Sequence, residues 1–574
     1  MNPPLLPEHL YRPRSLWLLF GGLALVLLIG NGRTLLWNQD EAAYAGFGLT
    51  MLESGDWLVP DFMWSDVHRK TPLHFWGIGG AYAIFGPSEW ATRLTSVLAI
   101  MGMAGLLWVQ GRRHFGEQVA WLSVVVAGTH IFTTFFTKMA LTDGPLLFFE
   151  TLAAFGILNV LRYRSRAWVV WFWVAIALGT LTKGPPIILF AGFFGLLLLI
   201  FHPRRWNLLR LHPWFFGPVA MLPVVAWGYG TYLRDGGVFL EWLYDWYVSR
   251  RVTGQVFGQT GPPGYHLGLF LAFGLPWLAF VPVAVASAFR GLRVAYRSIG
   301  AAPTLLIPRE PLMLMGLWLI AGWLPYEFTT SKLPSYVAAA YPAMMLLIAH
   351  QVILLPTGSI KRWWLAVPAY VQLVISVLLG CALVGLSALY LGWVAIVMST
   401  IAAIGLVGAP VTLLHQYRLH STSTPTLSHR YRRRAMVYYV GCLLLFFVST
   451  YGYIMPRASR VLLGGQYDAA AYLAAQPDLD PGGHIVIAAK RGRPPSLPFY
   501  LRTLTGHPIR EAYDIDTLVR LYQSPETAAL ILSPSLAASL SDRMVAGAAL
   551  DAYAIPTRYI DRTDTFTYIV VLPD

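Results

Sequence analysis

Charged residues are scarce in this sequence, and that scarcity decides the broad class of the protein. Asp, Glu, Lys and Arg make up only 12% of the 574 residues, whereas 56% of the residues are hydrophobic. Ordinary soluble domains carry about 25% charged residues. A soluble chain could not bury this much apolar surface, which also gives a mean hydropathy of +0.55. The composition therefore excludes an ordinary soluble protein and indicates one that a lipid bilayer solvates.

The sequence also has few cysteines and lacks the common motifs of soluble enzymes. Its two cysteines, Cys381 and Cys442, lie inside apolar runs and offer no disulfide framework. It contains no HExxH zinc motif, no phosphate-binding P-loop and no G-x-S-x-G nucleophile elbow. Asp66, His68 and His74 match no zinc-ligand spacing. The sequence therefore implies no firm cofactor and leaves only a divalent cation open.

The positive charge is spread along the chain rather than gathered on a soluble domain. The net charge is +14, and most basic residues stand in short links between apolar runs. This distribution favours anionic lipid headgroups over nucleic acid as the partner. Arg12 and Arg14 precede a long apolar run that has no small-residue cleavage site. We therefore predict a first membrane span there rather than a cleaved signal.

Apolar runs long enough to cross a bilayer, which takes about 20 residues, recur along most of the chain. This length criterion predicts about thirteen spans. They fall near residues 15–35, 91–110, 119–137, 141–162, 168–182, 185–202, 213–232, 266–289, 311–327, 333–353, 363–389, 391–415 and 436–455. Because the number is odd, we expect the two ends of the chain on opposite sides of the membrane.

The short links between these spans carry the basic residues that set orientation. If the N-terminus is cytoplasmic, every basic cluster in a short link falls on the cytoplasmic side, as the positive-inside rule requires. These residues are Arg112, Arg113, Arg162, Arg164, Arg166, Arg204, Arg205, Arg210, Arg290, Arg293, Arg297, Arg309, Lys361, Arg362, Arg430, Arg432, Arg433 and Arg434. We therefore predict a multi-pass protein with a cytoplasmic N-terminus.

Three longer pieces remain for the outer side, namely residues 36–90, 233–265 and 456–574. The last piece alternates segments that suit helices with short apolar runs, at His484–Ala489, Ala528–Leu532 and Thr567–Leu572. About 120 residues suffice to bury a core. We predict a membrane domain over residues 1–455, with interfacial helices in its first outer loop, and an outer α/β domain over residues 456–574.

Acidic residues stand at two places on the predicted outer surface. Asp40 and Glu41 directly follow the first span, and Asp143 begins a later span in Thr142-Asp143-Gly144-Pro145. The plain interpretation is helix capping, since Asp at a helix start accepts free backbone N–H groups. The alternative is that the two carboxylates converge on one site.

Several basic residues break the charge rule on this outer side. They are Arg69, Lys70, Lys183, Arg250, Arg251 and Lys332. Each alone could be solvated surface, or an interfacial side chain that extends its charge to water. Together they indicate a face that binds an anion such as a lipid phosphate.

The order of these residues resembles the GT-C superfamily of membrane glycosyltransferases, in the bacterial branch of aminoarabinose transferases and protein O-mannosyltransferase relatives. The resemblance covers roughly residues 15–345. It rests on Asp40-Glu41, Ser54-Gly55-Asp56-Trp57-Leu58-Val59-Pro60, Lys70-Thr71-Pro72, Phe75-Trp76, Thr142-Asp143-Gly144-Pro145, Thr182-Lys183-Gly184-Pro185 and Ser331-Lys332-Leu333-Pro334-Ser335-Tyr336. It implies a GT-C fold of about thirteen spans in the bacterial inner membrane, with a periplasmic C-terminal α/β domain.

The resemblance also implies a reaction, the inverting transfer of a sugar from a polyprenyl-phosphate donor such as undecaprenyl phosphate to a periplasmic acceptor. It assigns catalysis to Asp40 and Asp143, and it assigns the donor phosphate to Lys70, because positive charge beside a leaving phosphate lowers the barrier. Weaker candidates for the phosphate are Arg69, Arg250, Arg251, Lys332 and Tyr336. Those for substrate binding are Glu41, Tyr44 and Lys183.

The chain departs from the aminoarabinose transferase pattern in two places. Ala42 and Ala43 replace the middle pair of Asp-Glu-Thr-Arg-Tyr, and Arg69-Lys70-Thr71-Pro72 replaces Glu-Lys-Pro. The specific prediction is 4-amino-4-deoxy-L-arabinose transferred to a lipid A phosphate, and the alternative is a hexose or a glycan or protein acceptor. A hydroxyl acceptor would need Asp40 as general base, whereas a phosphate acceptor would need it only for orientation.

A lipid or polysaccharide transporter is the rival from another class. Transporters carry charges within their spans near the midplane, whereas the unusual charges here gather at one interface. An envelope polymerase would need a long outer loop late in the chain, and a non-catalytic scaffold gives no reason for outward lysines. We therefore predict an enzyme.

Overall fold

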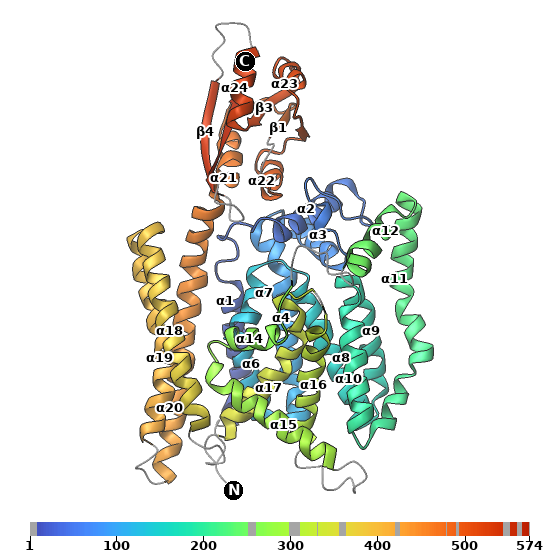
Figure 1. The fold of residues 1–574 in the computed structure, drawn as a ribbon, viewed down its shortest axis with the longest axis vertical. Coiled ribbons are helices and arrows are strands. Elements are labelled where there is room, and N and C mark those ends of the chain that lie inside the picture. Colours follow the sequence, from blue (N-terminus) through green and yellow to red (C-terminus); the bar gives the residue numbers. More distant parts are fainter. Residues whose placement is uncertain are drawn as a thin grey trace. The chain divides into compact units, whose positions relative to one another are not determined.

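The computed structural model describes residues 8–250, 260–297, 310–329, 331–354, 363–419, 425–477, 479–488, 493–543, 551–558 and 565–572. The chain forms two compact units (Figure 1). We call Met1–Ile29, Lys70–His74 and Leu94–Gly452 the helical unit, and Gly30–Arg69, Phe75–Arg93 and Tyr453–Asp574 the mixed unit.

The helical unit consists of helices joined mostly by short links. Its helices are α1 (Pro13–Leu28), α5 (Gly111–Phe115), α6 (Glu117–Gly128), α7 (Ile131–Lys138), α8 (Asp143–Tyr163), α9 (Arg166–Lys183), α10 (Pro186–Phe201), η3 (Arg205–Leu211), α11 (Pro213–Asp235), α12 (Val238–Tyr244), η4 (Asp245–Ser249), α14 (Tyr265–Ala272), η5 (Leu278–Phe280), α15 (Val281–Arg297), α16 (Glu310–Glu327), η7 (Pro334–Ala340), α17 (Tyr341–Leu354), α18 (Trp363–Tyr390), α19 (Trp393–Leu419) and α20 (Pro425–Ser449). Helices α3 (Leu73–Phe85) and α4 (Glu89–Val109) contribute residues to both units.

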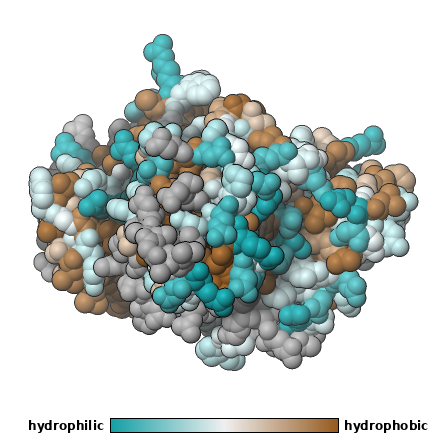
Figure 2. Space-filling model, turned by 90° about the horizontal axis from the view of Figure 1, so that it is seen from above, coloured by the Kyte–Doolittle hydropathy of each residue, from teal (hydrophilic) through white to brown (hydrophobic). Residues whose placement is uncertain are grey.

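Helix α18 shows why these segments suit a bilayer. Its large apolar side chains Val374, Leu378 and Leu386 are exposed, whereas its polar Gln372 and Ser376 are fully buried. The Gln372 amide donates to the Pro276 carbonyl and accepts from the Ala279 N–H. Apolar side chains outside and a hydrogen-bonded polar group such as the Gln372 amide inside form the pattern that lipid favours. The face of the molecule drawn in Figure 2 differs from the apolar exposed side of α18, because hydrophilic side chains cover much of that face.

The chain is a multi-pass membrane protein, but fewer helices meet the criteria for a span than the sequence predicts. Among the described residues, six helices are long and apolar enough to cross a membrane, or up to eight if two bent pairs each count as one span. Helices α1 and α10 are apolar but shorter. The predicted span at residues 266–289 is divided between α14 and α15. Gly274 and Pro276 lie in that break, and such residues end helices even where the composition is apolar.

The basic links at one end of the helical unit contact each other, as the predicted orientation requires. The Glu310 carboxylate lies 3.2 Å from Arg162 and 3.1 Å from His202, which brings the ends of α8 and α10 to the start of α16. The Tyr163 hydroxyl donates to the Arg113 carbonyl at the end of α5. These predicted cytoplasmic links therefore share one end of the unit. Arg309, Lys361 and Arg362, by contrast, lie outside the described residues.

A buried lysine donates hydrogen bonds to the C-terminal end of α1. The Lys138 ammonium, at the end of α7, donates to the carbonyls of Val26, Leu27 and Ile29 at 3.1, 2.8 and 2.8 Å. The last carbonyls of a helix have no partner within it. Lys138 therefore satisfies the end of the first helix with all three of its N–H donors.

The mixed unit contains a five-stranded sheet flanked by helices (Figure 1). The order is β2-β1-β3-β5-β4, with β1 parallel to β2 and β3, and β5 antiparallel to β3 and β4. Its elements are α2 (Asp40–Ser54), η2 (Asp66–His68), α21 (Met455–Ala474), β1 (His484–Ala488), α22 (Ser496–Thr505), β2 (Ile509–Glu511), α23 (Ile515–Tyr522), β3 (Thr527–Leu532), α24 (Pro534–Arg543), β4 (Asp551–Arg558) and β5 (Thr565–Leu572).

The three predicted apolar runs of the tail are strands β1, β3 and β5. Strand β3 is buried along its whole length, as a central strand covered on both faces should be. The side chains of Val486, Leu530 and Val571 share a core with Leu518 and Leu540 of the covering helices. The C-terminal sheet domain is therefore confirmed, while the boundary at residue 455 stays a prediction.

Candidate active site

The predicted site residues fall into two groups, one in each unit. In the mixed unit, Asp40 is the first residue of α2, and its side chain remains 49% exposed. Its Oδ1 atom lies 3.0 Å from the Tyr44 hydroxyl, one turn along α2, and 3.0 Å from His68 Nδ1. Because an ionised carboxylate can only accept hydrogen bonds, both neighbours donate to it. Asp40 is thus a carboxylate oriented by two donors and still accessible to solvent.

Neither predicted catalytic carboxylate caps its helix. The residue before α2 is Gln39 and the residue before α8 is Thr142, and neither side chain makes a capping hydrogen bond. Asp40 and Asp143 follow as the first helical residues, where the positive end of the helix dipole favours negative charge. Both carboxylates point instead to other side chains. The capping interpretation is therefore wrong for Asp40 and Asp143.

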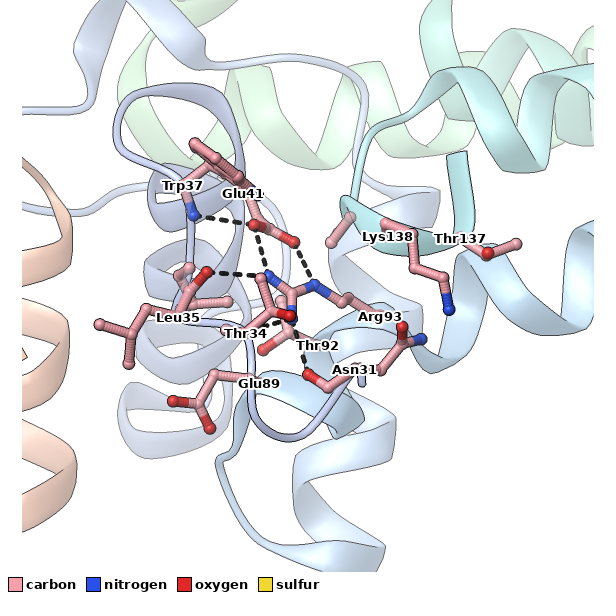
Figure 3. Close-up of polar contacts among 12 residues, drawn as sticks. Asn31, Thr34, Leu35, Trp37, Glu41, Glu89, Thr92, Arg93, Thr137 and Lys138 are labelled. Carbon is pink, nitrogen blue, oxygen red and sulfur yellow. Dashed lines mark hydrogen bonds and ion pairs between the residues drawn. The ribbon is translucent and has the colours of Figure 1, made fainter. Parts of the chain in front are cut away.

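Glu41 and Arg93 form an ion pair with no exposed side-chain surface. Arg93 donates to both Glu41 oxygens at 2.8 and 2.9 Å, and to the carbonyls of Asn31, Thr34 and Leu35 at 2.6, 2.7 and 3.1 Å. Figure 3 shows the guanidinium at the centre of these oxygens. Glu41 also accepts the Trp37 N–H at 2.9 Å. The carboxylate is therefore occupied, and we revise the predicted substrate contact of Glu41 to a structural role.

The guanidinium of Arg69 is neutralised by two carboxylates. It lies 2.5 Å from Asp61 and 2.7 Å from Asp66, in the loop between α2 and α3. Two acidic partners leave no net positive charge for an approaching phosphate. We therefore revise the role of Arg69 from phosphate binding to shaping this loop.

In the helical unit, four predicted site residues come together at the start of α8. Asp143 lies 2.5 Å from the Lys183 ammonium at the end of α9, and both side chains are about nine-tenths buried. Lys70 also acts electrostatically on Asp143, and the Ser335 hydroxyl lies near it. The Lys183 ammonium lies 5.8 Å from the centre of the Tyr336 ring in η7. Asp143, Lys183, Lys70 and Tyr336 therefore lie near one another within this unit, while the predicted convergence of Asp40 with Asp143 stays a prediction.

The remaining predicted phosphate ligands are engaged elsewhere. Lys332 is buried, and its ammonium donates to the Glu327 carboxylate at 3.2 Å and to the carbonyls of Glu327 and Pro262. Arg250 lies 2.7 Å from Asp245. Because three protein oxygens use the three donors of Lys332, we revise its role to a structural one. Arg251 lies outside the described residues.

His74 secures the loop that carries Lys70. Its Nε2 atom donates to the Ala140 carbonyl at 3.0 Å, and its Nδ1 accepts from the Thr95 hydroxyl at 3.3 Å. Burial lowers the pKa of His74 to about 4, so the ring is neutral at physiological pH. Among the described residues, no group of three or more His, Cys, Asp or Glu side chains could hold a metal ion.

Each unit also contains a cavity. In the helical unit, an apolar cavity of about 450 Å³ is lined among others by Leu267, Phe270, Phe289, Leu319, Ile320 and Trp323. In the mixed unit, a cavity of about 420 Å³ is lined by Thr50, Asp61, Phe62, Met63, Pro498, Arg502, Pro508 and Ile509. The first suits hydrocarbon and the second offers both apolar and hydrogen-bonding groups.

Known proteins resemble this chain in sequence and in structure. Residues 69–229 match the family model described as dolichyl-phosphate-mannose-protein mannosyltransferase. In structure, the chain matches ArnT from Cupriavidus metallidurans, crystallised with undecaprenyl phosphate, with a TM-score of 0.71 and 20% identity over 98% of this chain and 99% of that one. The chain has the GT-C fold.

The names of two sequence relatives of this chain state the same activity. The undecaprenyl phosphate-alpha-4-amino-4-deoxy-L-arabinose arabinosyl transferase 2 of Pseudomonas fluorescens is 27% identical over 352 residues, which are 58% of this chain and 59% of the relative. A relative from Aeromonas salmonicida, named as an arabinosyl transferase of the same donor, is 27% identical over 345 residues, which are 56% of this chain and 57% of the relative. The chain thus spans just under three fifths of the length of these curated relatives.

The GT-C fold confirms the predicted class, a mostly helical polytopic protein with a C-terminal mixed sheet. Sequence reasoning missed three residues that contact the predicted site residues, namely His68, Arg93 and Glu327. Arg93 carried a signal, because a charged residue inside an apolar helix is costly unless it is paired. His68 was visible only as an unmatched metal ligand, and nothing near it in the sequence indicated its contact with Asp40.

Proposed function

We propose that this GT-C chain transfers a sugar, with inversion, from a polyprenyl-phosphate donor to an acceptor of the bacterial envelope. Our specific proposal is 4-amino-4-deoxy-L-arabinose from undecaprenyl phosphate onto a lipid A phosphate. The sequence relatives support the donor, because their names contain it. The observation that carries the proposal is the cluster of Lys70, Lys183 and Asp143 at the first residue of a membrane helix.

This cluster suits a lipid phosphate for a physical reason. The donor tail lies in hydrocarbon and its phosphate lies at the interface, so cations are needed where a span begins. Negative charge grows on the leaving phosphate as the glycosidic bond breaks, and a fixed ammonium such as that of Lys70 stabilises it in the transition state. The apolar cavity of the helical unit is of a kind that accommodates part of a polyprenyl tail.

Asp40 provides the group that acts on the acceptor. Its half-exposed carboxylate is oriented by Tyr44 and His68. With a hydroxyl acceptor it removes the proton as the oxygen attacks the anomeric carbon. A phosphate acceptor is already nucleophilic, and Asp40 then orients it or stabilises positive charge on the sugar. Direct displacement on the donor inverts the anomeric centre in both cases.

The site is expected on the periplasmic side of the inner membrane. Supporting this orientation, basic links meet at one end of the helical unit, which the positive-inside rule assigns to the cytoplasm. Single cysteines introduced at exposed Arg543 and exposed Arg210 should label from opposite sides of the membrane. Labelling of both from the same side would refute this topology.

A second acceptor class is favoured by the family model. Its description names a mannosyltransferase that acts on protein, and it covers the segment from Arg69 to Tyr229. The alternative function is therefore transfer of a hexose to a glycan or protein by the same displacement. It differs from the first proposal in the donor sugar and the acceptor, and not in the roles of Asp40 and Lys70.

One assay tests both functions. Purified protein in lipid nanodiscs is given undecaprenyl phosphate that carries either aminoarabinose or a hexose, with lipid A or a peptide as acceptor, and release of undecaprenyl phosphate is measured. We expect acceptor-dependent release with aminoarabinose and lipid A, and its loss in Asp40→Asn and Lys70→Ala. Asp516→Asn, which changes an exposed carboxylate of α23, is the matched control. Unchanged turnover in Asp40→Asn would refute the assignment.

A further inference from the structure

The segment before Asp40 has no regular structure, although it is buried. Residues 35–37 belong to no helix or strand, and Leu35 and Leu36 are almost fully buried. Buried backbone groups need hydrogen-bond partners. An irregular segment cannot find them in a helix or sheet, so side chains from elsewhere must supply them.

Three of these contacts come from the C-terminal part of the chain, more than 400 residues away. The Leu35 N–H donates to the Ser459 hydroxyl at 3.1 Å, and the Leu36 N–H donates to the Tyr500 hydroxyl at 2.8 Å. The Ser496 hydroxyl, at the first residue of α22, donates to the Asn38 side chain. All three contacts lie within the mixed unit.

Four further contacts, to this segment and to the residues before it, come from Glu41 and Arg93. Arg93 holds the carbonyls of residues 31, 34 and 35, and Glu41 holds the Trp37 N–H. The Tyr500 hydroxyl also donates to Glu89, one turn before Arg93 on α4. Burial and then the nearby Glu89 charge raise the pKa of Tyr500 well above its usual value, so the hydroxyl keeps its proton. The contacts from the C-terminal part of the chain and those from Glu41 and Arg93 therefore form one continuous network around the segment.

A strained residue shows what the network holds in place. Gln39, directly before Asp40, has φ of 69° and ψ of −114°. Non-glycine residues rarely adopt positive φ, and they keep it only where the surroundings over-determine the backbone. If the segment loosened, Gln39 could relax, and the first turn of α2 with Asp40 would change direction.

From these contacts we propose that the C-terminal domain positions residues 35–38, the segment that leads into the Asp40 carboxylate. Ser459, Ser496 and Tyr500 are positioning residues that hold residues 35–38 and thereby fix the orientation of the Asp40 carboxylate. The proposal gives the C-terminal domain a part in catalysis, and it rests on the proposed function for the role of Asp40. Further contacts between the same elements agree with it, since Arg502 of α22 pairs with Glu53 of α2.

Tyr500→Phe in the full-length protein tests this directly, because it removes one hydroxyl and keeps the ring. Tyr553→Phe, on an exposed tyrosine of β4, is the matched control. Two readouts are taken in nanodiscs, namely amide hydrogen exchange of the peptide that covers residues 30–45, and kcat and KM for the donor. Exchange of a peptide from β3 serves as the internal reference for global stability.

We expect exchange at residues 35–38 to rise on the order of tenfold in Tyr500→Phe, with β3 unchanged. We expect kcat to fall by about 10- to 100-fold, the size of effect that a misplaced catalytic group produces, while KM for the donor stays within about twofold. Ser496→Ala should show the same effects in weaker form, and it serves if Tyr500→Phe does not fold. Exchange and kcat equal to those of the parent would overturn the proposal. If the parent itself transfers no sugar, the proposed function fails, and the exchange measurement still decides whether the C-terminal domain holds the segment.

Discussion

Asp40 and Asp143 occupy the same position in their helices and have opposite surroundings. Each is the first residue of a helix. Asp40 is half exposed and accepts from the neutral hydroxyl of Tyr44 and from His68, whereas Asp143 is buried against the Lys183 ammonium. An exposed carboxylate with oriented donors can meet a substrate and change its protonation state. A buried carboxylate paired with an ammonium chiefly holds charge and geometry. Position in the sequence makes the two look alike, and their neighbours separate them.

The largest effect is expected from a substitution of Asp40, the half-exposed carboxylate of this comparison. Asp40→Asn keeps the shape and removes the charge, so kcat should fall by about 10²–10⁴, the range for loss of a general base. Thermal stability should barely change, because the side chain is half exposed. Turnover and the melting temperature are measured on the same preparation. A large loss of stability would instead give Asp40 a structural role.

Stability should respond more strongly to the fully buried pair beside it. Glu41→Gln leaves the Arg93 charge without its partner in a site that water does not reach. Removal of one partner of a buried ion pair costs about 3–5 kcal/mol. Chemical denaturation of the full-length protein, followed by tryptophan fluorescence, measures this cost. The double variant with Arg93→Met should recover part of it, and equal losses in both variants would contradict the pairing.

Asp143→Asn tests the buried carboxylate of the comparison. It leaves the buried Lys183 ammonium unpaired, and we expect a loss of about 3 kcal/mol in stability, by the same physical argument. Lys183→Met in the same chain should restore most of the stability without restoring activity. If Asp143→Asn loses activity with full stability, Asp143 acts on the substrate in the way that Asp40 does.

A smaller effect concerns pH. The pKa of His74 is lowered by burial to about 4 from an ordinary value of 6.5, so the unfolded chain binds the proton more readily. This contribution to stability is present above pH 6.5 and is lost as the pH falls from 6.5 to 4, by about 2 kcal/mol between pH 7 and pH 5. His74→Gln keeps a donor for the Ala140 carbonyl and cannot titrate. The variant should therefore lose less stability than the parent over this interval, and an equal loss would contradict the assignment.

The smallest effect distinguishes orientation from charge at Asp40. His68→Asn retains a donor near the position of Nδ1, whereas His68→Phe removes it. We expect kcat to fall about tenfold in the phenylalanine variant, the cost of one hydrogen bond to a charged group, and to be largely restored in the asparagine variant. Equal rates in both variants would show that His68 does not orient Asp40.

Much of the fold was predictable because it depends on local composition. Apolar runs identify most helices of the helical unit, and alternating short runs identify β1, β3 and β5. The number of spans was less predictable, because a composition window does not register where Gly274 and Pro276 interrupt a helix. Only the described structure shows that α14 and α15 are separate.

The candidate site was predictable only in part. Asp143, Lys183 and Tyr336 stand in short outer links, and proximity to one interface was enough to group them. Arg93 as the partner of Glu41, and the Pro262 carbonyl as one partner of Lys332, were not predictable in this way, because they lie 52 and 70 residues away in the chain. Tyr500 is the extreme case, since no local pattern relates it to Leu36.

The buried lysine at the end of α1 has a consequence for biogenesis. Helix α1 is made before α7, but its last carbonyls receive donors from Lys138, about 110 residues later in synthesis. Until α7 has been inserted, those carbonyls need water or the insertion machinery as partners, because hydrocarbon offers none. Helix α1 therefore cannot complete its hydrogen bonding as it emerges, and its final packing must wait for α7.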